Sequence, residues 1–424
     1  MLSQSVRRAA VPRHSFGHVT VAGLVLIGAI GLSGCGTASR NRHEVLVVPG
    51  EYATIQAAVD HAVPGDLVLI SPGVYREAVV SHVPDLDIRG RDRNTVVIDG
   101  SNRLPNGITL AANGDSVENL TVRRFAINGL LFTLSDNYGN GSVLHGYRAS
   151  YVTAYDNGLY GLYAFGATGG LFDHDYASGQ PDSGIYIGQC RPCNAVVEHS
   201  MAESNRVGFE AANASGGLTI VDSQFDSNRA GVVVESDTTE KLLPQVGAVI
   251  AGNVIANNNN PVTPTTSEGA DVFGYGIAIG GGSNDSVLRN LVTGNVSVGV
   301  IVTGGAGYSP KNDKVSGNAL SGNRVDLVYA GIGSDTIATR GNCFSGNSFS
   351  SSDPTAIEST VACGHDGVVR SSFAGAESPD GVDYTTIAPP PAMPEMVAAA
   401  TAPASPAADE PPAVNFSSVV LPAS

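Results

Sequence analysis

Basic residues, long apolar runs and repeated cysteine motifs are all scarce in this chain of 424 residues. Lys and Arg number 23 against 39 Asp and Glu, so the formal net charge is −16, which argues against a nucleic-acid partner. Trp is absent, and 42% of the residues are apolar, which suits one large globular body with terminal tails. A single Cys-x-x-Cys motif, Cys190 to Cys193, lacks the second copy that a zinc site needs and the βαβ context of a thioredoxin-like site.

An apolar stretch near the amino terminus predicts where the protein works. Residues 19–32 are too short for a comfortable membrane span; three Arg precede them, and the sequence Leu-Ser-Gly-Cys ends at Cys35. This segment resembles a bacterial lipoprotein signal with its lipobox. The resemblance implies that residues 1–34 are a signal peptide, that Cys35 is lipidated, and that the lipid alone anchors the protein at the extracytoplasmic face of the cell membrane. An ordinary cleaved signal or a signal anchor is the alternative.

The remaining cysteines fit an oxidising compartment. If Cys35 carries a lipid, four cysteines are left, and they can pair as two disulfides, Cys190 with Cys193 and Cys343 with Cys363. For the first pair, a redox or metal-binding role is the alternative to a structural turn.

A short polar pattern recurs through the second half of the chain and predicts a solenoid. A polar residue is followed five positions later by Asn, and then by a Gly or Asp that opens a β-branched run. Successive copies lie 23 to 37 residues apart, so the unit is a coil of roughly two dozen residues with loops in some turns. We expect the Asn side chains to stack between coils and bind one another and the backbone. The copies are Ser200–Asn205, Ser223–Asn228, Asn253–Asn258, Asn290–Asn295, Asn318–Asn323 and Asn342–Asn347.

The segment before the repeats carries the signal of an end cap. Strands are expected at residues 45–48 and 67–70, and Thr54 can cap a short amphipathic helix between them that covers the open end of the first coil. The run YATIQAAVDHAVPGDLVLISPGVYREAVV with the later LDIRGRDRNTVVIDG resembles the amino-terminal part of right-handed parallel β-helix proteins of the pectate-lyase-like superfamily.

This resemblance implies an all-β chain forming a single right-handed parallel β-helix solenoid with a short N-terminal capping helix. We expect a tether at residues 35–44, the β-helix at 45–370 and a disordered Pro/Ala-rich tail at 371–424. Lyases, hydrolases, esterases, epimerases and non-catalytic binders share this fold, so the activity stays open.

Superposing the coils turns outward positions into candidate sites. Six segments beginning at Gly align in one column, which places Tyr163, Tyr186 and Glu210 on adjacent coils, facing outward. With Asp182 nearby, the stacked phenols would form a substrate-binding platform for a sugar ring. The inserts at 238–245 and 257–274 should project over one face. An aromatic ladder that merely stiffens the sheet is the alternative.

A second candidate lies at a turn between strands. The same alignment brings Asp173 and His174 beside Glu198 and His199, with Tyr151 next to His174, about one strand spacing apart. These groups could act as a catalytic acid and base or bind a cation such as calcium. Resemblance to pectate lyases implies a catalytic Arg as well, for which Arg148 and Arg206 are nearest in sequence. An ordinary solvated polar turn is the alternative.

These observations predict a lipid-anchored protein that binds a polysaccharide. If the protein is an enzyme, which the residues leave open, lyase or hydrolase chemistry is expected; no family catalytic motif is present. The alternative is a non-catalytic scaffold that binds another cell-envelope protein.

Overall fold

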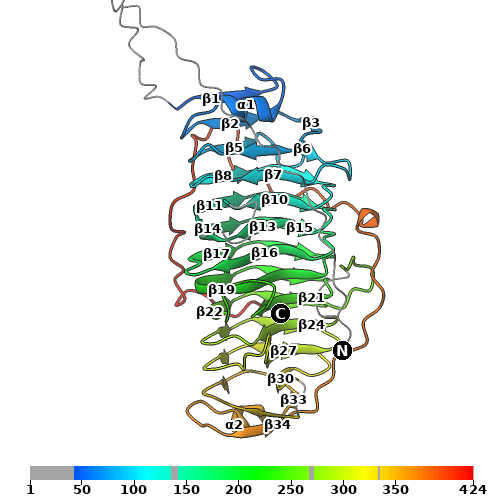
Figure 1. Cartoon of the computed structure of the whole chain (residues 1–424). Coiled ribbons are helices and arrows are strands. Elements are labelled where there is room, and N and C mark those ends of the chain that lie inside the picture. Colours follow the sequence, from blue (N-terminus) through cyan, green and yellow to red (C-terminus); the bar gives the residue numbers. More distant parts are fainter. Residues whose placement is uncertain (1–42, 135–141, 267–271, 333–334, 424) are drawn as a thin grey trace, which may run out of the picture. The chain divides into compact units, whose positions relative to one another are not determined.

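A computed structural model describes residues 43–134, 142–266, 272–332 and 335–423. The expected signal peptide, Cys35 and most of the tether lie outside these residues and stay predictions. The described chain from residue 43 onward coils as a right-handed parallel β-solenoid (Figure 1). No helix within the described ranges has the length and apolar character needed to span a bilayer.

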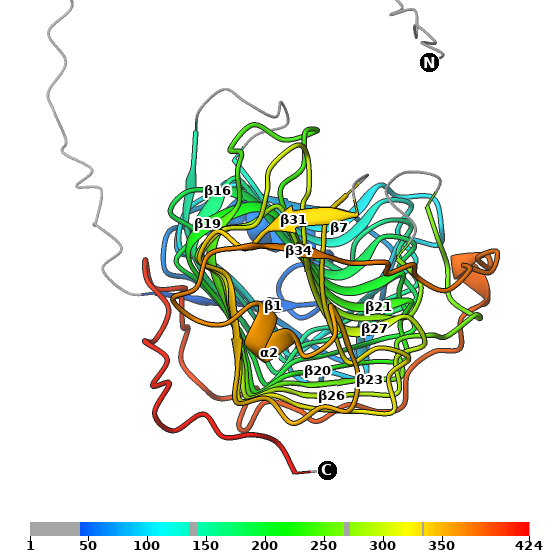
Figure 2. The same cartoon turned by 90° about the horizontal axis from the view of Figure 1, so that it is seen from below.

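Each coil from β2 to β30 contributes one strand to each of three parallel sheets, which we name A, B and C in the order the chain visits them (Figure 2). Sheet A contains β1 (Val45–Val48), β2 (Leu67–Ile70), β5 (Asp87–Gly90), β8 (Asp115–Glu118), β11 (Leu144–Ser150), β14 (Ala167–Asp173), β17 (Ala195–Glu198), the second half of β19 (Val207–Val221), β22 (Val246–Ala251), β25 (Ser286–Leu288), β28 (Lys314–Ser316) and β32 (Cys343–Ser345). Sheet B contains β3 (Gly73–Tyr75), β6 (Val96–Asp99), β9 (Thr121–Arg123), β12 (Thr153–Tyr155), β15 (Tyr176–Ser178), β18 (Met201–Glu203), β20 (Gln224–Asp226), β23 (Val254–Ala256), β26 (Leu291–Thr293) and β29 (Ala319–Ser321). Sheet C contains β4 (Val79–Ser81), β7 (Asn106–Leu110), β10 (Asn128–Phe132), β13 (Leu162–Phe165), β16 (Ser183–Cys190), the first half of β19, β21 (Ala230–Glu235), β24 (Tyr275–Gly280), β27 (Val298–Thr303), β30 (Leu327–Ala330) and β33 (Ser352–Asp353).

The alternation of sheet C confirms the expected register. Ile185 pairs with Phe209, which pairs in turn with Val232, and all three side chains are fully buried in the central core. The same column continues through Ile277 and Val300. Because β-strand side chains alternate between faces, the residues between these positions point away from the core.

Two Asn ladders lie at the turns between sheets and confirm the structural role of the repeat. At the turn from B to C, Asn228 Nδ2 donates to Asn258 Oδ1 at 3.1 Å, and Asn258 Nδ2 donates to Asn295 Oδ1 at 3.3 Å. At the turn from A to B, Asn253 Nδ2 donates to Asn290 Oδ1 at 3.0 Å. All of these side chains are buried, so the amides supply partners to one another where water is excluded.

The register predicted from the sequence for the last repeat copy is wrong. The alignment of Asn342–Asn347 with Asn318–Asn323 puts Asn347 beside Asn323, but Asn318 Nδ2 donates to Asn347 Oδ1 at 2.9 Å. Asn342 lies instead at the turn from C to A, where its Oδ1 accepts from Asp313 N at 2.7 Å. The longer final coil displaces the pattern by five residues.

Short helices cover both ends of the coiled core. Thr54 accepts a hydrogen bond from Ala57 N at 3.1 Å and caps α1 (Ile55–His61), whose Ile55 and Ala58 are fully buried. At the other end α2 (Ile357–Thr360) buries Ile357. The α1 cap therefore agrees with the sequence prediction. Beyond the regular coils, β31 (Thr336–Ala338) pairs antiparallel with β34 (Val368–Arg370), and a 3-10 turn, η1, spans Tyr384–Thr386.

Both expected disulfides are present, joining Cys190 to Cys193 and Cys343 to Cys363. The first closes the loop between β16 and β17, and the second ties the segment after α2 to β32.

The carboxy-terminal segment, red in Figure 1, runs across successive strands of sheet A, from coil to coil. Arg89 Nη1 donates to Ala402 O at 2.8 Å, and Ser405 N donates to Asp87 Oδ2 at 2.9 Å. Further along, Val419 packs with Val221 in an apolar cluster on the outer face of the sheet. Disorder of this segment in solution stays a prediction.

Candidate functional site

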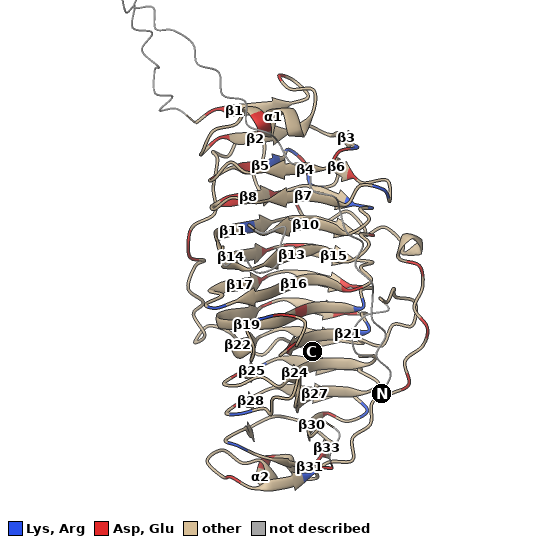
Figure 3. Cartoon of the chain, in the orientation of Figure 1, with Lys and Arg blue, Asp and Glu red and all other residues tan. Residues whose placement is uncertain are grey.

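A pocket of about 590 Å³ lies on the outer face of sheet C. Its lining includes all four residues proposed from sequence as substrate-binding: Tyr163, Tyr186, Asp182 and Glu210. Residues 238–241 of the first insert and Val272 of the second line it as well, so both inserts reach this face as expected. Acidic and basic residues are interspersed along the coils (Figure 3). Five acidic residues line this pocket.

Strand register brings the pocket residues together. Tyr163 of β13 pairs with Tyr186 of β16, and Tyr186 pairs with Glu210 of β19. Adjacent strands lie about 4.8 Å apart, so identical outward positions become neighbours although they lie 23 and 24 positions apart in the sequence. The structure thus brings these three side chains together; whether they bind substrate stays a prediction.

The aromatic rings differ from the expected stacked platform. The Tyr163 and Tyr186 rings meet edge to face, with centroids 5.1 Å apart and planes at 82°. Tyr160 packs against both, and each of the two expected rings is only 5% exposed. A Cβ at Gly188 would lie 2.4 Å from Tyr186 Cε1, so only glycine there leaves room for the tilted ring. The rings therefore form a wall of the pocket rather than an open shelf.

Carboxyl groups line the pocket beside the rings. Arg206 Nη1 lies 3.2 Å from Asp182 Oδ1 and 3.7 Å from Glu210 Oε2, and Ser183 Oγ donates to Glu210 Oε2 at 2.5 Å. Burial and the neighbouring Asp182 raise the pKa of Glu210 well above its usual range, although Arg206 opposes this shift. Arg206 is therefore part of this pocket, and the prediction that it could serve the turn site is wrong.

Two further carboxyls have pKa values near neutrality. Burial, aided by Asp237, raises the pKa of Glu235 to about 7, and burial likewise raises the pKa of Glu240 to about 7 despite the hydrogen bond that Tyr186 donates to it. Groups that are half ionised near pH 7 can take up or release protons at that pH, as general acid–base catalysis requires.

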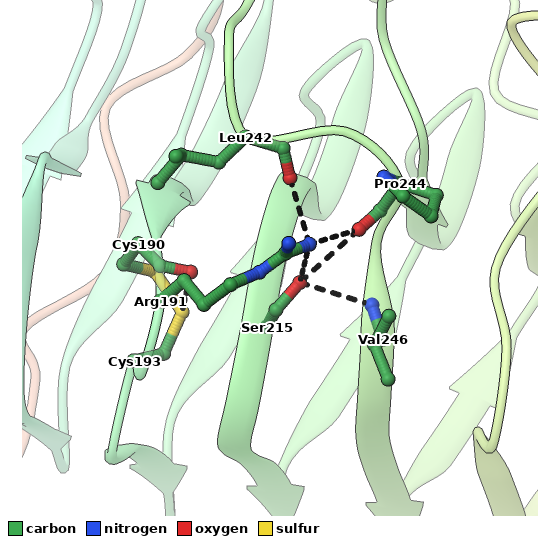
Figure 4. The surroundings of a disulfide bond; sticks show 7 residues. All are labelled: Cys190, Arg191, Cys193, Ser215, Leu242, Pro244 and Val246. Carbon is green, nitrogen blue, oxygen red and sulfur yellow. Dashed lines mark hydrogen bonds between the residues drawn. A yellow bond between two sulfur atoms is a disulfide. The ribbon is translucent and has the colours of Figure 1, made fainter.

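The insert that supplies Glu240 is held in place by the disulfide loop (Figure 4). Arg191, between the two bonded cysteines, donates from Nη2 to Leu242 O at 2.9 Å, to Pro244 O and to Ser215 Oγ at 3.1 Å. Gln189 Oε1 also accepts from Lys241 N at 2.7 Å. The insert is therefore a fixed wall of the pocket.

Sequence reasoning missed Tyr160, Glu235 and Glu240. Glu235 lies two positions after Val233 on β21, so strict alternation along the strand already indicates its outward direction. No periodic signal points to Tyr160 or Glu240, because the former lies in a turn and the latter in an insert.

The second candidate site is also assembled as the alignment predicted. Asp173 pairs with Glu198 across sheet A. The His174 and His199 rings stack with centroids 4.8 Å apart, and Tyr151 stacks on His174 at 4.5 Å and 8°. Asp173 Oδ1 lies 2.6 Å from His174 Nδ1 and 3.2 Å from His199 Nδ1. Burial and the charge of Asp173 raise the pKa of Glu198.

The expected arginine does not join this turn site. Arg148 pairs with Glu118, and Arg206 lies in the pocket. The Arg93 guanidinium lies 6.0 Å from the Tyr151 ring centre, but its Nε donates to Thr153 Oγ1 at 2.8 Å in a buried setting. The analogy with a pectate-lyase base therefore has no support at this turn.

Comparison with solved structures returns distant β-helix proteins. The A-module of the mannuronan C-5 epimerase AlgE4 of Azotobacter vinelandii shares 16% identity, covering 70% of this chain and 91% of that one, with a TM-score of 0.45. An alginate lyase from Paenibacillus shares 12% identity, covering 72% of this chain and 99% of that one, with a TM-score of 0.40. The pectin methylesterase PemA of Erwinia chrysanthemi shares 17% identity, covering 57% of this chain and 78% of that one, with a TM-score of 0.33. Identities this low say nothing about activity. No curated protein sequence matches the chain.

A protein family provides the firmer comparison. The family described as "Right handed beta helix region" matches residues 106–238 and 138–318, which together span just over half of the chain. The matched span holds most of the Asn ladders, the outer pocket and the turn with the two histidines. The chain therefore belongs to the right-handed β-helix family.

Proposed function

We propose that this protein is an extracytoplasmic, lipid-anchored β-helix protein that binds a polysaccharide in the pocket over sheet C. One observation carries the proposal: aromatic rings and carboxyl groups from four coils and an insert line a single cavity of about 590 Å³. Sugar sites commonly combine these groups, because rings pack against C–H faces while carboxylates accept hydroxyl hydrogen bonds. The lipid anchor is supported by the sequence around Cys35, and an oxidising compartment by the two disulfides.

The charge of the pocket narrows the class of glycan. Its lining holds five carboxyl groups and two basic side chains, namely Asp182, Glu210, Glu235, Asp237 and Glu240 against Arg206 and Lys241. The pKa values of Glu210, Glu235 and Glu240 are already raised, so this pocket disfavours further negative charge. Like charges placed together disfavour binding by several kcal/mol in poorly solvated sites, so a polyuronate is a poor fit. Neutral or amino-sugar polymers suit this lining better.

If the pocket turns over its glycan, hydrolysis fits better than elimination. Glycoside hydrolysis requires one protonated and one ionised carboxyl group near the scissile bond. Glu235 and Glu240, each with a pKa of about 7, can populate both forms at neutral pH. A lyase would need to neutralise a uronate carboxylate, for which an acidic pocket is unsuited.

Binding can be tested by calorimetry with the purified protein and four hexasaccharides: cellulose-derived, xylan-derived, chitosan-derived and oligogalacturonate. We expect binding of a neutral or amino sugar, weakened about ten-fold in Tyr186→Ala, which corresponds to about 1.4 kcal/mol. Tyr308→Ala removes a tyrosine outside the pocket that is 39% exposed, and should bind like the parent.

Product analysis on the same glycans separates binding from turnover. Release of reducing ends that is lost in Glu235→Gln or Glu240→Gln would establish a hydrolase, and binding without products would establish a lectin-like protein. Absence of binding to every glycan tested would reject the proposal and favour a scaffold for another envelope protein.

A further inference from the structure

The turn from sheet A to sheet B places histidines on two successive coils. His174 and His199 both have left-handed backbone, with φ of 56° and 49°. Most L-residues avoid this region, although His is among the more tolerant. Because the backbone repeats from one coil to the next, the two imidazoles are held about one strand spacing apart, and strand pairing fixes Asp173 beside Glu198. The spacing is therefore built into the solenoid rather than left to flexible side chains.

Three ligand atoms converge at this turn. One each from Asp173, His174 and His199 lie within 4.8 Å of one another. The carboxylate oxygen Asp173 Oδ1 lies 2.6 Å from His174 Nδ1 and 3.2 Å from His199 Nδ1. Ligands held about 2.0 to 2.1 Å from a tetrahedral zinc ion lie about 3.3 Å apart. The separation to His199 already matches, and that to His174 must open by less than about 1 Å.

The donor chemistry selects the kind of ion. Calcium takes six to eight oxygen ligands, whereas imidazole nitrogen suits zinc, copper, nickel and iron. We propose that Asp173, His174 and His199 bind a divalent transition metal, with zinc as the reference ion. This set of two imidazoles and one carboxylate differs from the calcium site that the acidic residues alone suggest.

A cavity borders one of the three proposed ligand residues. His199 and Asp222 line a cavity of about 400 Å³, which Val420 of the carboxy-terminal segment borders. The side chains of His174 and His199 are 39% and 48% exposed, so an ion can enter. Three protein ligands beside an accessible cavity are typical of zinc sites that keep water or substrate as the fourth ligand.

Zinc binding to the full chain tests the proposal by competition with a fluorescent chelator, with calcium measured in parallel. We expect one zinc ion per chain with a dissociation constant in the micromolar range or below, and no displacement by millimolar calcium. His174→Asn and His199→Asn, which keep a residue suited to left-handed backbone, should each weaken zinc binding at least ten-fold. His145→Asn, at an exposed histidine outside the cluster, is the matched control.

A second readout guards against effects on folding. Zinc should raise the melting temperature of the parent but not of the His199→Asn variant, since only the parent gains stability from the bound ion. Cobalt added in place of zinc should produce a visible spectrum that both Asn variants lose. Unchanged zinc affinity in both variants, or preference for calcium, would overturn the proposal. The glycan pocket on sheet C uses other residues, so failure of one proposal leaves the other standing.

Discussion

Two regions of the same solenoid use the same interior in different ways. In the coils between β22 and β29, the A-to-B and B-to-C turns carry buried Asn, and the outward residues at the middle of the sheet C strands are Ala278 and Ile301, which are apolar. In the coils between β13 and β19, which we call the variable coils, His174 and His199 directly precede the ladder position of the A-to-B turn. The outward residues of sheet C in these coils are Tyr186 and Glu210. The inward columns are apolar in both regions.

The difference shows how a repeat can vary without losing its backbone. At the A-to-B turn of the variable coils Asp175 and Ser200 occupy the ladder position in place of Asn, and Asp175 N donates to Ser200 Oγ at 3.1 Å. Ser200 N donates in turn to Ser223 Oγ at 3.1 Å. One acceptor per coil is enough to satisfy the buried backbone, so the outward and turn positions are free to carry other chemistry.

The largest expected effect is the loss of stability when an Asn of the regular ladder is removed. Asn258→Ala removes the acceptor of Asn228 N and Nδ2, and leaves Phe225 O and Asn295 Oδ1 without the Asn258 Nδ2 donor. Each buried group left unsatisfied costs about 1 to 3 kcal/mol, so we expect a loss of about 3 to 5 kcal/mol in the free energy of unfolding, measured with urea.

Ser200→Ala is the matched change in the variable coils. It leaves Asp175 N without its acceptor and should cost only about 1 to 2 kcal/mol. Equal losses at Ser200 and Asn258 would show that the amide ladder adds nothing beyond the single acceptor.

The fold could be predicted because its determinants repeat. Alternating apolar residues and Asn at fixed spacing identify the coil, and that spacing placed Tyr163 beside Tyr186 and His174 beside His199. What failed depends on loop length or on contacts without a period. The final coil shifted register by five residues, and Glu240 enters the pocket from an insert. Ring tilt at Tyr186 follows from the space above Gly188, which a register alone does not specify.

A pH-dependent effect compares the ends of the solenoid with its middle. At the turn entering sheet A, Asp115 and Asp313 lie near the two ends, while Ala195 and Leu218 occupy the same column between them. Burial raises the pKa of Asp115 from its ordinary 3.8 to about 8, although Leu86 N donates to it at 3.1 Å. Between these two pKa values the folded chain keeps the Asp115 proton that the unfolded chain has lost. The stability that this proton contributes is fully present below about pH 4 and is lost as the pH rises to about 8.

Asp115→Asn removes that proton linkage. Full linkage amounts to about 1.4 kcal/mol per pH unit, so between pH 5 and pH 7 the variant should gain about 2.7 kcal/mol on the parent in the free energy of unfolding. Asp115→Ala also removes the acceptor of Leu86 N, and its free energy of unfolding should therefore be lower than that of Asp115→Asn at both pH values. Parallel pH profiles for parent and Asn variant would contradict the assignment.

The smallest expected effect on stability comes from a change that loosens the insert at residues 238–245. Arg191→Ala removes the donor to Leu242 O and Pro244 O that holds residues 238–245 against the solenoid. The ladder and the inward columns are untouched, so the free energy of unfolding should change by less than about 1 kcal/mol. Amide hydrogen exchange of residues 239–241 should nevertheless become faster, because the insert would open more often.

If the pocket binds a glycan as proposed, the same variant should lose about three-fold in affinity, since part of the binding energy is then used to order the insert. Arg191→Lys keeps the charge but not the forked donors, and should lie between parent and Ala variant. Faster exchange with unchanged affinity would show that Glu240 and its insert are a cover rather than part of the binding wall. The functional region would then be reduced to the strands of sheet C, where Tyr186 and Glu210 are fixed by the same register that fixes the core.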